Sequence, residues 1–228
     1  MLMTRKQRLI VSYLTMRRTI GVLGIALPLV VVIGGLIENP HMLQGSISGY
    51  YYTNMRDFFV GILCVVALFL ISYQGYERID NSVANLAGFS ALGMIIFPTK
   101  MSYLKIEKVG MFLMEDDVSG FLHLLFATIF FFALSYNSIF LFTKRHSINI
   151  SKEKKRRNIL YRACGIIMLL QILLIILYMV FLRETYLSKT YPILIFESIA
   201  LFAFGISWLV KGNTFFRDQI KNVDEMDT

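Results

Sequence analysis

A short polar segment at residues 46–57 carries the densest group of chemically capable side chains in the chain. It reads SISGYYYTNMRD, so hydroxyl, phenol, guanidinium and carboxylate groups stand directly before a strongly apolar run. A membrane protein keeps such a group at an aqueous interface or around an internal polar pocket. The segment therefore predicts where function lies, without naming a reaction.

Three ionisable residues are predicted at a similar depth on three apolar helices. Asp57 opens one helix, with Arg56 beside it, while His123 and Glu197 lie about one and two turns into two others. Each of these groups would be costly in contact with lipid, so a shared interior pocket is the cheaper arrangement. We expect a ligand site that also includes Tyr50.

The same residues offer a hydrolase interpretation. Ser46 or Ser48 would be the nucleophile, His123 the base, and Asp57 or Glu197 the orienting carboxylate. Serines in a glycine-containing loop more often form turns, however, and the carboxylates could equally pair with nearby cations. The sequence leaves open whether the protein is an enzyme.

A metal interpretation would use His41, His123, Asp57 and Glu197 around an open water position. No paired-histidine spacing supports it, and the third histidine, His146, is predicted on the opposite side of the membrane. The sequence therefore predicts no metal and no other cofactor.

Composition and hydropathy predict an all-α polytopic membrane protein. Of the 228 residues, 56% are hydrophobic, and six runs approach the length of a membrane span. Small residues in the third run predict close helix packing, although this run is the shortest and least apolar. The six predicted spans are 19–37, 58–76, 82–97, 120–142, 159–182 and 191–210.

The charge distribution predicts both termini in the cytoplasm. The segments on the terminal side carry 17 of the 23 Lys and Arg residues. This predicts a cytoplasmic segment 1–18, a transmembrane domain 19–211 and a cytoplasmic tail 212–228. Tyr73, Tyr76, Tyr161 and Trp208 are predicted at the inner interface. The net charge of +8 reflects topology and anionic lipid, and no nucleic-acid partner is expected.

The predicted inner loop 144–157 has seven basic residues in fourteen. Contact with anionic lipid explains it, and docking of a cytoplasmic nucleotide is the minor alternative because no glycine-rich phosphate loop accompanies it. Asn85, Asn137 and Gln171 lie within spans, where such groups usually form interhelical hydrogen bonds. They also leave open a homo-oligomeric channel or effector, for example in anti-phage defence, gated from the cytoplasm.

Several short motifs resemble a family of bacterial six-helix inner-membrane proteins of unknown function. They are SISGYYYTNMRD at 46–57, YQGYER at 73–78, NLAG at 85–88, FPT at 97–99 and FGISWLVKG at 204–212. The resemblance covers the chain from the first predicted helix to Lys211. It implies a multi-pass protein of the bacterial inner membrane and no particular activity.

The chain is more distantly similar to the superfamily of alkaline ceramidases and progestin-receptor-like proteins. That likeness implies a metal-dependent lipid hydrolase, but the paired histidines that such enzymes carry on the last helix are missing here. The leading interpretation is an inner-membrane protein whose outward-facing polar pocket binds or handles a lipid or small molecule. Its expected partners are membrane lipids, that ligand and further copies of the chain.

Overall fold

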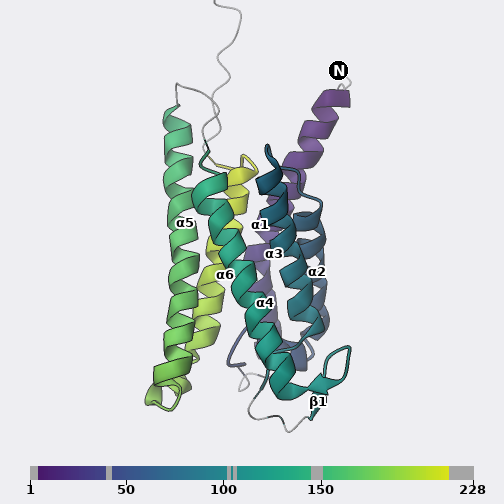
Figure 1. Cartoon of the computed structure of the whole chain (residues 1–228), viewed down its shortest axis with the longest axis vertical. Coiled ribbons are helices and arrows are strands. Elements are labelled where there is room, and N and C mark those ends of the chain that lie inside the picture. Colours follow the sequence, from purple (N-terminus) through teal and green to yellow (C-terminus); the bar gives the residue numbers. More distant parts are fainter. Residues whose placement is uncertain (1–4, 40–42, 102–103, 105–106, 145–150, 216–228) are drawn as a thin grey trace, which may run out of the picture.

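The computed structural model describes residues 5–39, 43–101, 104, 107–144 and 151–215 of the chain. Six α-helices dominate these residues, which confirms the predicted helical class (Figure 1). The helices are α1 (Arg5–Glu38), α2 (Arg56–Ile71), α3 (Arg78–Ile96), α4 (Asp116–Tyr136), α5 (Lys152–Leu177) and α6 (Pro192–Lys211).

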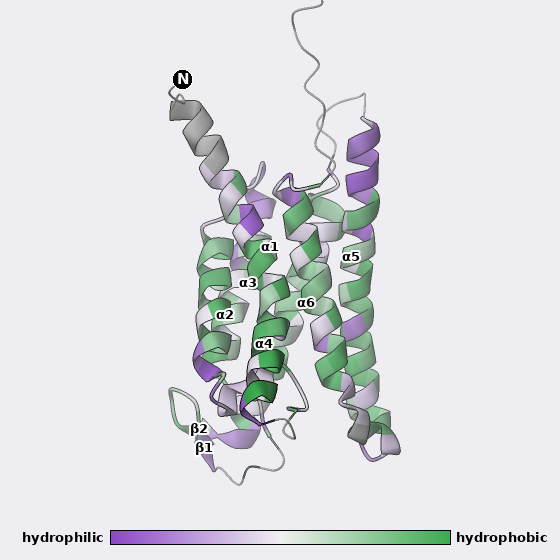
Figure 2. Cartoon of the chain, turned by 180° about the vertical axis from the view of Figure 1, so that it is seen from behind, coloured by the Kyte–Doolittle hydropathy of each residue, from purple (hydrophilic) through white to green (hydrophobic). Residues whose placement is uncertain are grey.

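The helices run alternately up and down (Figure 1), and their packing closes them into a ring. Each helix packs on the next one along the chain, and α6 returns to pack on α1. Hydrophobic residues cover the middle of the helices, and hydrophilic residues gather toward the two ends (Figure 2). We call the end that holds the start of α1 the upper end and the opposite one the lower end.

Two helices continue beyond their α-helical part as π-helices. One is η2 (Asn137–Leu141) after α4, and the other is η3 (Tyr178–Leu182) after α5. With these extensions five helices are long and apolar enough to cross a membrane. The sixth is α2, which is apolar but has only 16 residues. The expectation that the third helix is the shortest was therefore wrong, because α2 ends at Ile71 and not near Tyr76.

The predicted outer loop after α3 contains the only strands among the described residues. β1 (Lys108–Val109) pairs antiparallel with β2 (Met114–Glu115). Gly110 has a φ of +73° at the turn between them, a conformation that favours glycine. This short hairpin was not expected from the sequence, because two-residue strands leave no readable alternation of polar and apolar residues.

Small residues let neighbouring helices approach closely. Ala84, Ala87 and Ala91 of α3 are fully buried, as their spacing predicts. The contact between α1 and α6 is tighter still. A Cβ atom added to Gly205 would lie 2.6 Å from the carbonyl oxygen of Gly21. The ring closes between its first and last helices because both have glycine at this crossing.

Three of the four aromatic residues predicted at the inner interface lie inside the bundle, and the fourth, Tyr76, is 68% exposed. Trp208, Tyr73 and Tyr161 are all at most 2% exposed. The Trp208 ring meets Tyr73 and Phe142 edge-on, with centroids 5.1 and 5.3 Å away. The expectation of an interfacial belt was wrong for these three residues, since interior packing competes for the same amphipathic rings.

The Gly21–Gly205 crossing generates a stability prediction. Gly205→Ala should lower the free energy of unfolding by about 2 kcal/mol, because the added methyl group overlaps backbone of α1. Thermal melting of the purified protein in detergent measures the change. Gly61→Ala in α2 is the matched control, since a Cβ there meets no atom within 4 Å. Equal melting temperatures for the two variants would contradict this account of ring closure.

Candidate functional site

The polar segment identified in the sequence folds into the lower end of the ring. Its central part is a 3-10 helix, η1 (Ser48–Tyr52). Gln44, Ile47 and Tyr50 are at most 3% exposed, so the segment penetrates between the helices. Backbone groups buried in this way need partners, and side chains of the surrounding helices supply several of them.

Glu197 of α6 holds the entry to η1. Its Oε2 accepts a hydrogen bond of 2.5 Å from the backbone N–H of Ile47, and the N–H of Ser48 also contributes. Beside this contact, the N–H of Leu194 in α6 donates a hydrogen bond of 3.1 Å to the carbonyl oxygen of Gly45. The carboxylate therefore serves the free N–H groups at the start of η1 and ties residues 45–48 to α6.

His123 of α4 meets the same turn from the other side. Its Nδ1 lies 3.1 Å from the carbonyl oxygen of Met94 and 2.9 Å from that of Phe97. A carbonyl oxygen only accepts hydrogen bonds, so Nδ1 carries a proton and is the donor in both contacts. In the neutral ring Nε2 is then an acceptor, and it lies 2.9 Å from the Ser48 hydroxyl. The end of α3 thus fixes the tautomer that faces Ser48.

The two serines of the segment do different work. The Ser46 Oγ accepts the N–H of Gly49 at 3.0 Å, which is the ordinary role of a serine in a turn. The Ser48 Oγ instead pairs with His123. Ser48 and Glu197 also line a small internal cavity of about 30 Å³, enough for at least one water molecule.

A larger cavity of about 590 Å³ opens at the lower end between α4, η3 and α6. Ser46, His123 and Glu197 lie on its inner wall. Phe121, Leu124 and Met179 also line it and are exposed on the outer faces of α4 and η3. The cavity is therefore open toward the surface that a bilayer would cover, as well as toward the end of the bundle.

Charged groups surround the end-facing part of this cavity. Lys100 forms an ion pair with Asp117, and Arg183 is close enough to Lys100 to repel its charge. The hydrogen bond to Asp117 raises the pKa of the Lys100 ammonium. Two cations and one paired carboxylate thus stand where an anionic headgroup would lie.

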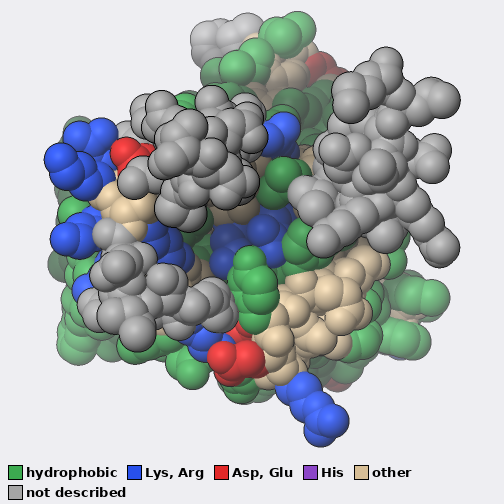
Figure 3. Space-filling model, turned by 90° about the horizontal axis from the view of Figure 1, so that it is seen from above, with side chains coloured by type: hydrophobic (Ala, Val, Ile, Leu, Met, Phe, Trp, Pro, Cys, Tyr) green, Lys and Arg blue, Asp and Glu red, His purple; other side chains and the backbone are tan. Residues whose placement is uncertain are grey.

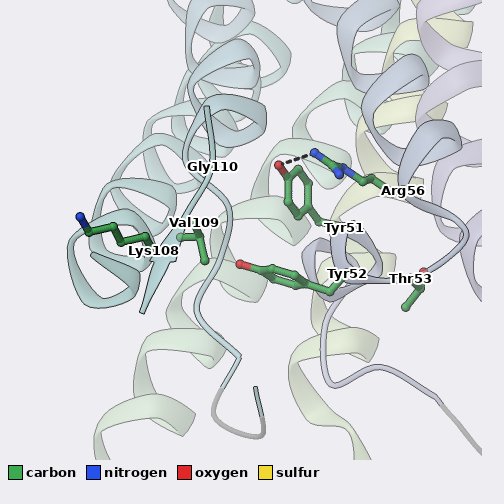
Figure 4. A pocket seen from close by; sticks show the side chains of 7 residues that line it. All are labelled: Tyr51, Tyr52, Thr53, Arg56, Lys108, Val109 and Gly110. Carbon is green, nitrogen blue, oxygen red and sulfur yellow. Dashed lines mark hydrogen bonds between the residues drawn. The ribbon is translucent and has the colours of Figure 1, made fainter. Parts of the chain in front are cut away.

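The structure separates Arg56, Asp57 and Tyr50 from His123 and Glu197. Arg56 is exposed, bonds the Tyr51 hydroxyl at 2.9 Å and borders another cleft of about 390 Å³ (Figure 4). Lys108, Val109 and Gly110 form the facing wall of that cleft. The structure thus brings His123, Glu197 and Ser46 to one cavity and places Arg56, Asp57 and Tyr50 elsewhere.

Asp57 and Tyr50 have places of their own. Asp57 is exposed in the first turn of α2, where a carboxylate suits the helix dipole. Tyr50 is fully buried, and its ring fills the space above Gly35 of α1. It lines neither of the cavities around Glu197. Depth along each helix was predicted well, but rotation about the helix axis was not.

Two other expectations concern metal and nucleotide. Among the described residues, no group of three or more His, Cys, Asp and Glu side chains could hold a metal ion. His41 and His146 lie outside the described residues, as do residues 145–150 of the basic loop. The nucleotide alternative for that loop stays a prediction.

The polar residues behind the channel alternative lie inside the ring. Asn137 is fully buried, and Gln171 is 9% exposed. The Oδ1 of Asn137 and the Oε1 of Gln171 have no hydrogen-bond partner within the described part of the chain, and neither has the Oδ1 of Asn85. These oxygen atoms therefore lack the expected interhelical hydrogen bonds, and the channel alternative stays a prediction.

Some residues around the large cavity gave no signal in the sequence. Tyr178, Met179 and Arg183 come from the end of α5, which continues as a π-helix. A π-helix shifts the faces of the residues that follow it, so helical periodicity cannot place them.

The bond from Ile47 to Glu197 generates a prediction about local order. Glu197→Ala should destabilise the protein by about 2 kcal/mol and speed amide exchange in residues 43–55, because buried N–H groups lose their acceptor. Hydrogen exchange read by mass spectrometry measures it. Glu197→Gln, which keeps an acceptor oxygen, should have a smaller effect. Unchanged exchange in Glu197→Ala would show that the carboxylate does not anchor this segment.

Comparisons with known proteins do not identify the chain. No protein-family model, no curated protein and no solved structure matches it. The resemblances inferred from short motifs therefore stay predictions. The described residues form a helical bundle with five helices long and apolar enough to cross a membrane, and three of the predicted site residues, Ser46, His123 and Glu197, line its lower cavity.

Proposed function

We propose that the protein is a multi-pass protein of the bacterial inner membrane that binds an amphiphilic molecule, most simply a lipid, in the cavity between α4, η3 and α6. The observation that carries the proposal is the composition of this cavity. Apolar walls open to the bilayer-facing surface, cations stand at its outer end, and His123 and Glu197 lie within it. Both termini are cytoplasmic in this proposal, so the cavity faces outward.

The layout of the cavity suits a lipid better than a water-soluble molecule. Phe121, Leu124 and Met179 give an acyl chain an apolar path between two helices. Lys100 and Arg183 offer charge-assisted hydrogen bonds to a headgroup at the outer end. Ser46 and Glu197 could hydrogen-bond hydroxyl or carbonyl groups that follow a headgroup. Ligand pockets commonly combine apolar walls with a few polar groups in this way.

Filling the cavity should abolish lipid retention. Leu124→Trp places an indole ring in the opening between α4 and η3 and should reduce co-purified lipid by about tenfold, the effect of losing about 1.4 kcal/mol of binding. Native mass spectrometry of the detergent-purified protein measures retained lipid. Leu124 is 39% exposed, so the protein should still fold.

Leu125→Trp is the matched control for this experiment. Leu125 is the next residue of α4 and is 43% exposed, but it does not line the cavity. Its substitution should leave lipid retention unchanged. Equal loss in both variants would indicate general lipid contact with the helix surface, and no loss in either would overturn the proposed binding site.

A second candidate function is hydrolysis of an ester or amide by Ser48 and His123. The 2.9 Å contact between the Ser48 hydroxyl and Nε2, with Nδ1–H held by two carbonyl oxygens, is the observation that favours it. Ser48 Oγ would attack the carbonyl carbon as its proton passes to Nε2, and the proton would then leave with the alcohol or amine. Water would release the acyl group from Ser48.

Two features make this the second candidate. The group that orients His123 is a pair of carbonyl oxygens, where a catalytic triad has a carboxylate, because Glu197 is engaged by Ile47. Ser48 is also only 9% exposed and borders the small cavity, not the large one. A substrate would reach its hydroxyl only past the Glu197 side chain, which borders both.

A fluorophosphonate probe tests the hydrolase candidate. Covalent labelling with loss of fluoride is expected at Ser48 in the native protein and should disappear in Ser48→Ala. Ser46→Ala should keep the label, because the Ser46 hydroxyl is engaged within its turn. Intact-protein mass spectrometry reads the adduct. An unlabelled native protein would leave lipid binding without hydrolysis as the function.

A further inference from the structure

A second site of polar chemistry lies at the upper end, opposite the cavity of the proposed function. Arg17 of α1 and Lys211, the last residue of α6, meet there above the buried aromatic rings. The Arg17 guanidinium lies 4.1 Å from the centroid of the Tyr13 ring and 5.4 Å from that of Tyr73. Lys211 Nζ lies 4.6 Å from the centroid of the Phe142 ring. Aromatic faces thus support both cations.

Arg17 is buried without an anion. It is 7% exposed, and its Nε has no hydrogen-bond partner among the residues that the structure describes. Its one hydrogen bond within the described residues is a long one of 3.4 Å, from Nη1 to the carbonyl oxygen of Lys211. A buried guanidinium ordinarily fills its donors with carboxylate or phosphate oxygens, so an unfilled N–H at this depth points to a missing acceptor.

Lys211 adds a second cation that has no direct ion pair. Within the described residues its ammonium group contacts aromatic rings but no hydrogen-bond acceptor. Arg17, Lys154 and Arg157 lie close enough to repel it, and Asp80 is the one carboxylate close enough to attract it. This end of the bundle therefore concentrates positive charge in its interior and not only on its surface.

The nearest carboxylates are already engaged. Lys144 Nζ binds Glu77 at 2.8 Å and Asp80 at 3.1 Å, and Asp80 also accepts the N–H groups of Tyr76 and Glu77. These contacts form the turn before α3 and hold it in place. Asp80 therefore serves its own turn and does not pair with Arg17.

A cleft gives access to Arg17 from outside. It has a volume of about 390 Å³ and lies between residues 13–17 of α1, the turn after α2 and Asn213, which follows α6. Its walls carry Tyr13, Gln74 and Tyr76, and Arg17 forms its inner end. In the view onto this end, basic side chains fill a hollow in the middle of the face (Figure 3).

We propose that this upper cleft binds a phosphate group, with the Arg17 guanidinium as its direct ligand and Lys211 adding charge behind it. The cleft is large enough for a phosphate with part of the molecule attached to it. The geometry fits the phosphate of an anionic lipid headgroup and that of a soluble molecule equally. The site shares no residue with the lower cavity, so it can be tested independently of the proposed function.

Binding can be measured as a thermal shift of the full-length protein in nanodiscs. Protein in phosphatidylcholine nanodiscs is melted with inorganic phosphate and with chloride at equal ionic strength, and compared with protein in nanodiscs that also contain phosphatidylglycerol. A rise of about 5 °C with phosphatidylglycerol alone assigns the phosphate to a lipid headgroup. The same rise with inorganic phosphate assigns it to a soluble ligand. No rise in either arm overturns the proposal.

Variants show whether the shift belongs to this cleft. Arg17→Gln should remove the shift and weaken binding of the effective probe by at least about tenfold. Lys211→Gln should weaken it less, and it keeps the backbone carbonyl that Arg17 contacts. Arg78→Gln is the matched control, because Arg78 is an exposed cation at the same end. A shift that persists in Arg17→Gln, or is lost equally in Arg78→Gln, overturns the site.

Discussion

The hydrogen bond between the Glu197 carboxylate and the Ile47 N–H organises the lower half of the molecule. It holds a polar, glycine-containing segment inside a ring of apolar helices, where free backbone groups would otherwise be costly. Because Ile47 is fixed, the next residue, Ser48, faces His123 across 2.9 Å. The segment then closes the inner wall of the large cavity. A single acidic residue on α6 thereby sets the position of the segment that faces His123 of α4.

The cavity itself follows from the way the ring is packed. α4 and α5 are held together at the upper end, where η2 also packs on α5, while η3 and the start of α4 border the opening at the lower end. α6 is held to α1 through the glycine crossing, so it cannot move across to fill the space. The opening is a property of helix packing, and the polar segment only lines it. The fold thus offers a lipid-sized space before any particular side chain is considered.

Hydropathy and charge were enough to predict the helices, because twenty-residue apolar runs have few alternative structures. Position along the predicted spans grouped His123 with Glu197, and the structure brings both to one cavity. The orientation of side chains about the helix axis could not be read from the sequence, and Arg56, Asp57 and Tyr50 were misplaced for this reason. Asp57 and Arg56 stand at the start of α2, where one residue of rotation turns a side chain from the interior to the surface. The β1–β2 hairpin and the π-helices were missed because both depend on tertiary contacts and leave no period in the sequence.

The two ends of the ring accommodate buried charge by opposite means. At the lower end, backbone groups satisfy the charged and polar side chains. Glu197 accepts hydrogen bonds from N–H groups, and His123 donates hydrogen bonds to carbonyl oxygens. At the upper end, the cations Arg17 and Lys211 rest on aromatic rings, which attract charge but do not fill N–H donors. Polar groups whose hydrogen bonds are satisfied keep the lower pocket in a fixed shape. The unfilled N–H donor of Arg17 at the upper end favours binding of an anion. The same ring of helices therefore presents a ready apolar cavity at one end and an incomplete electrostatic site at the other.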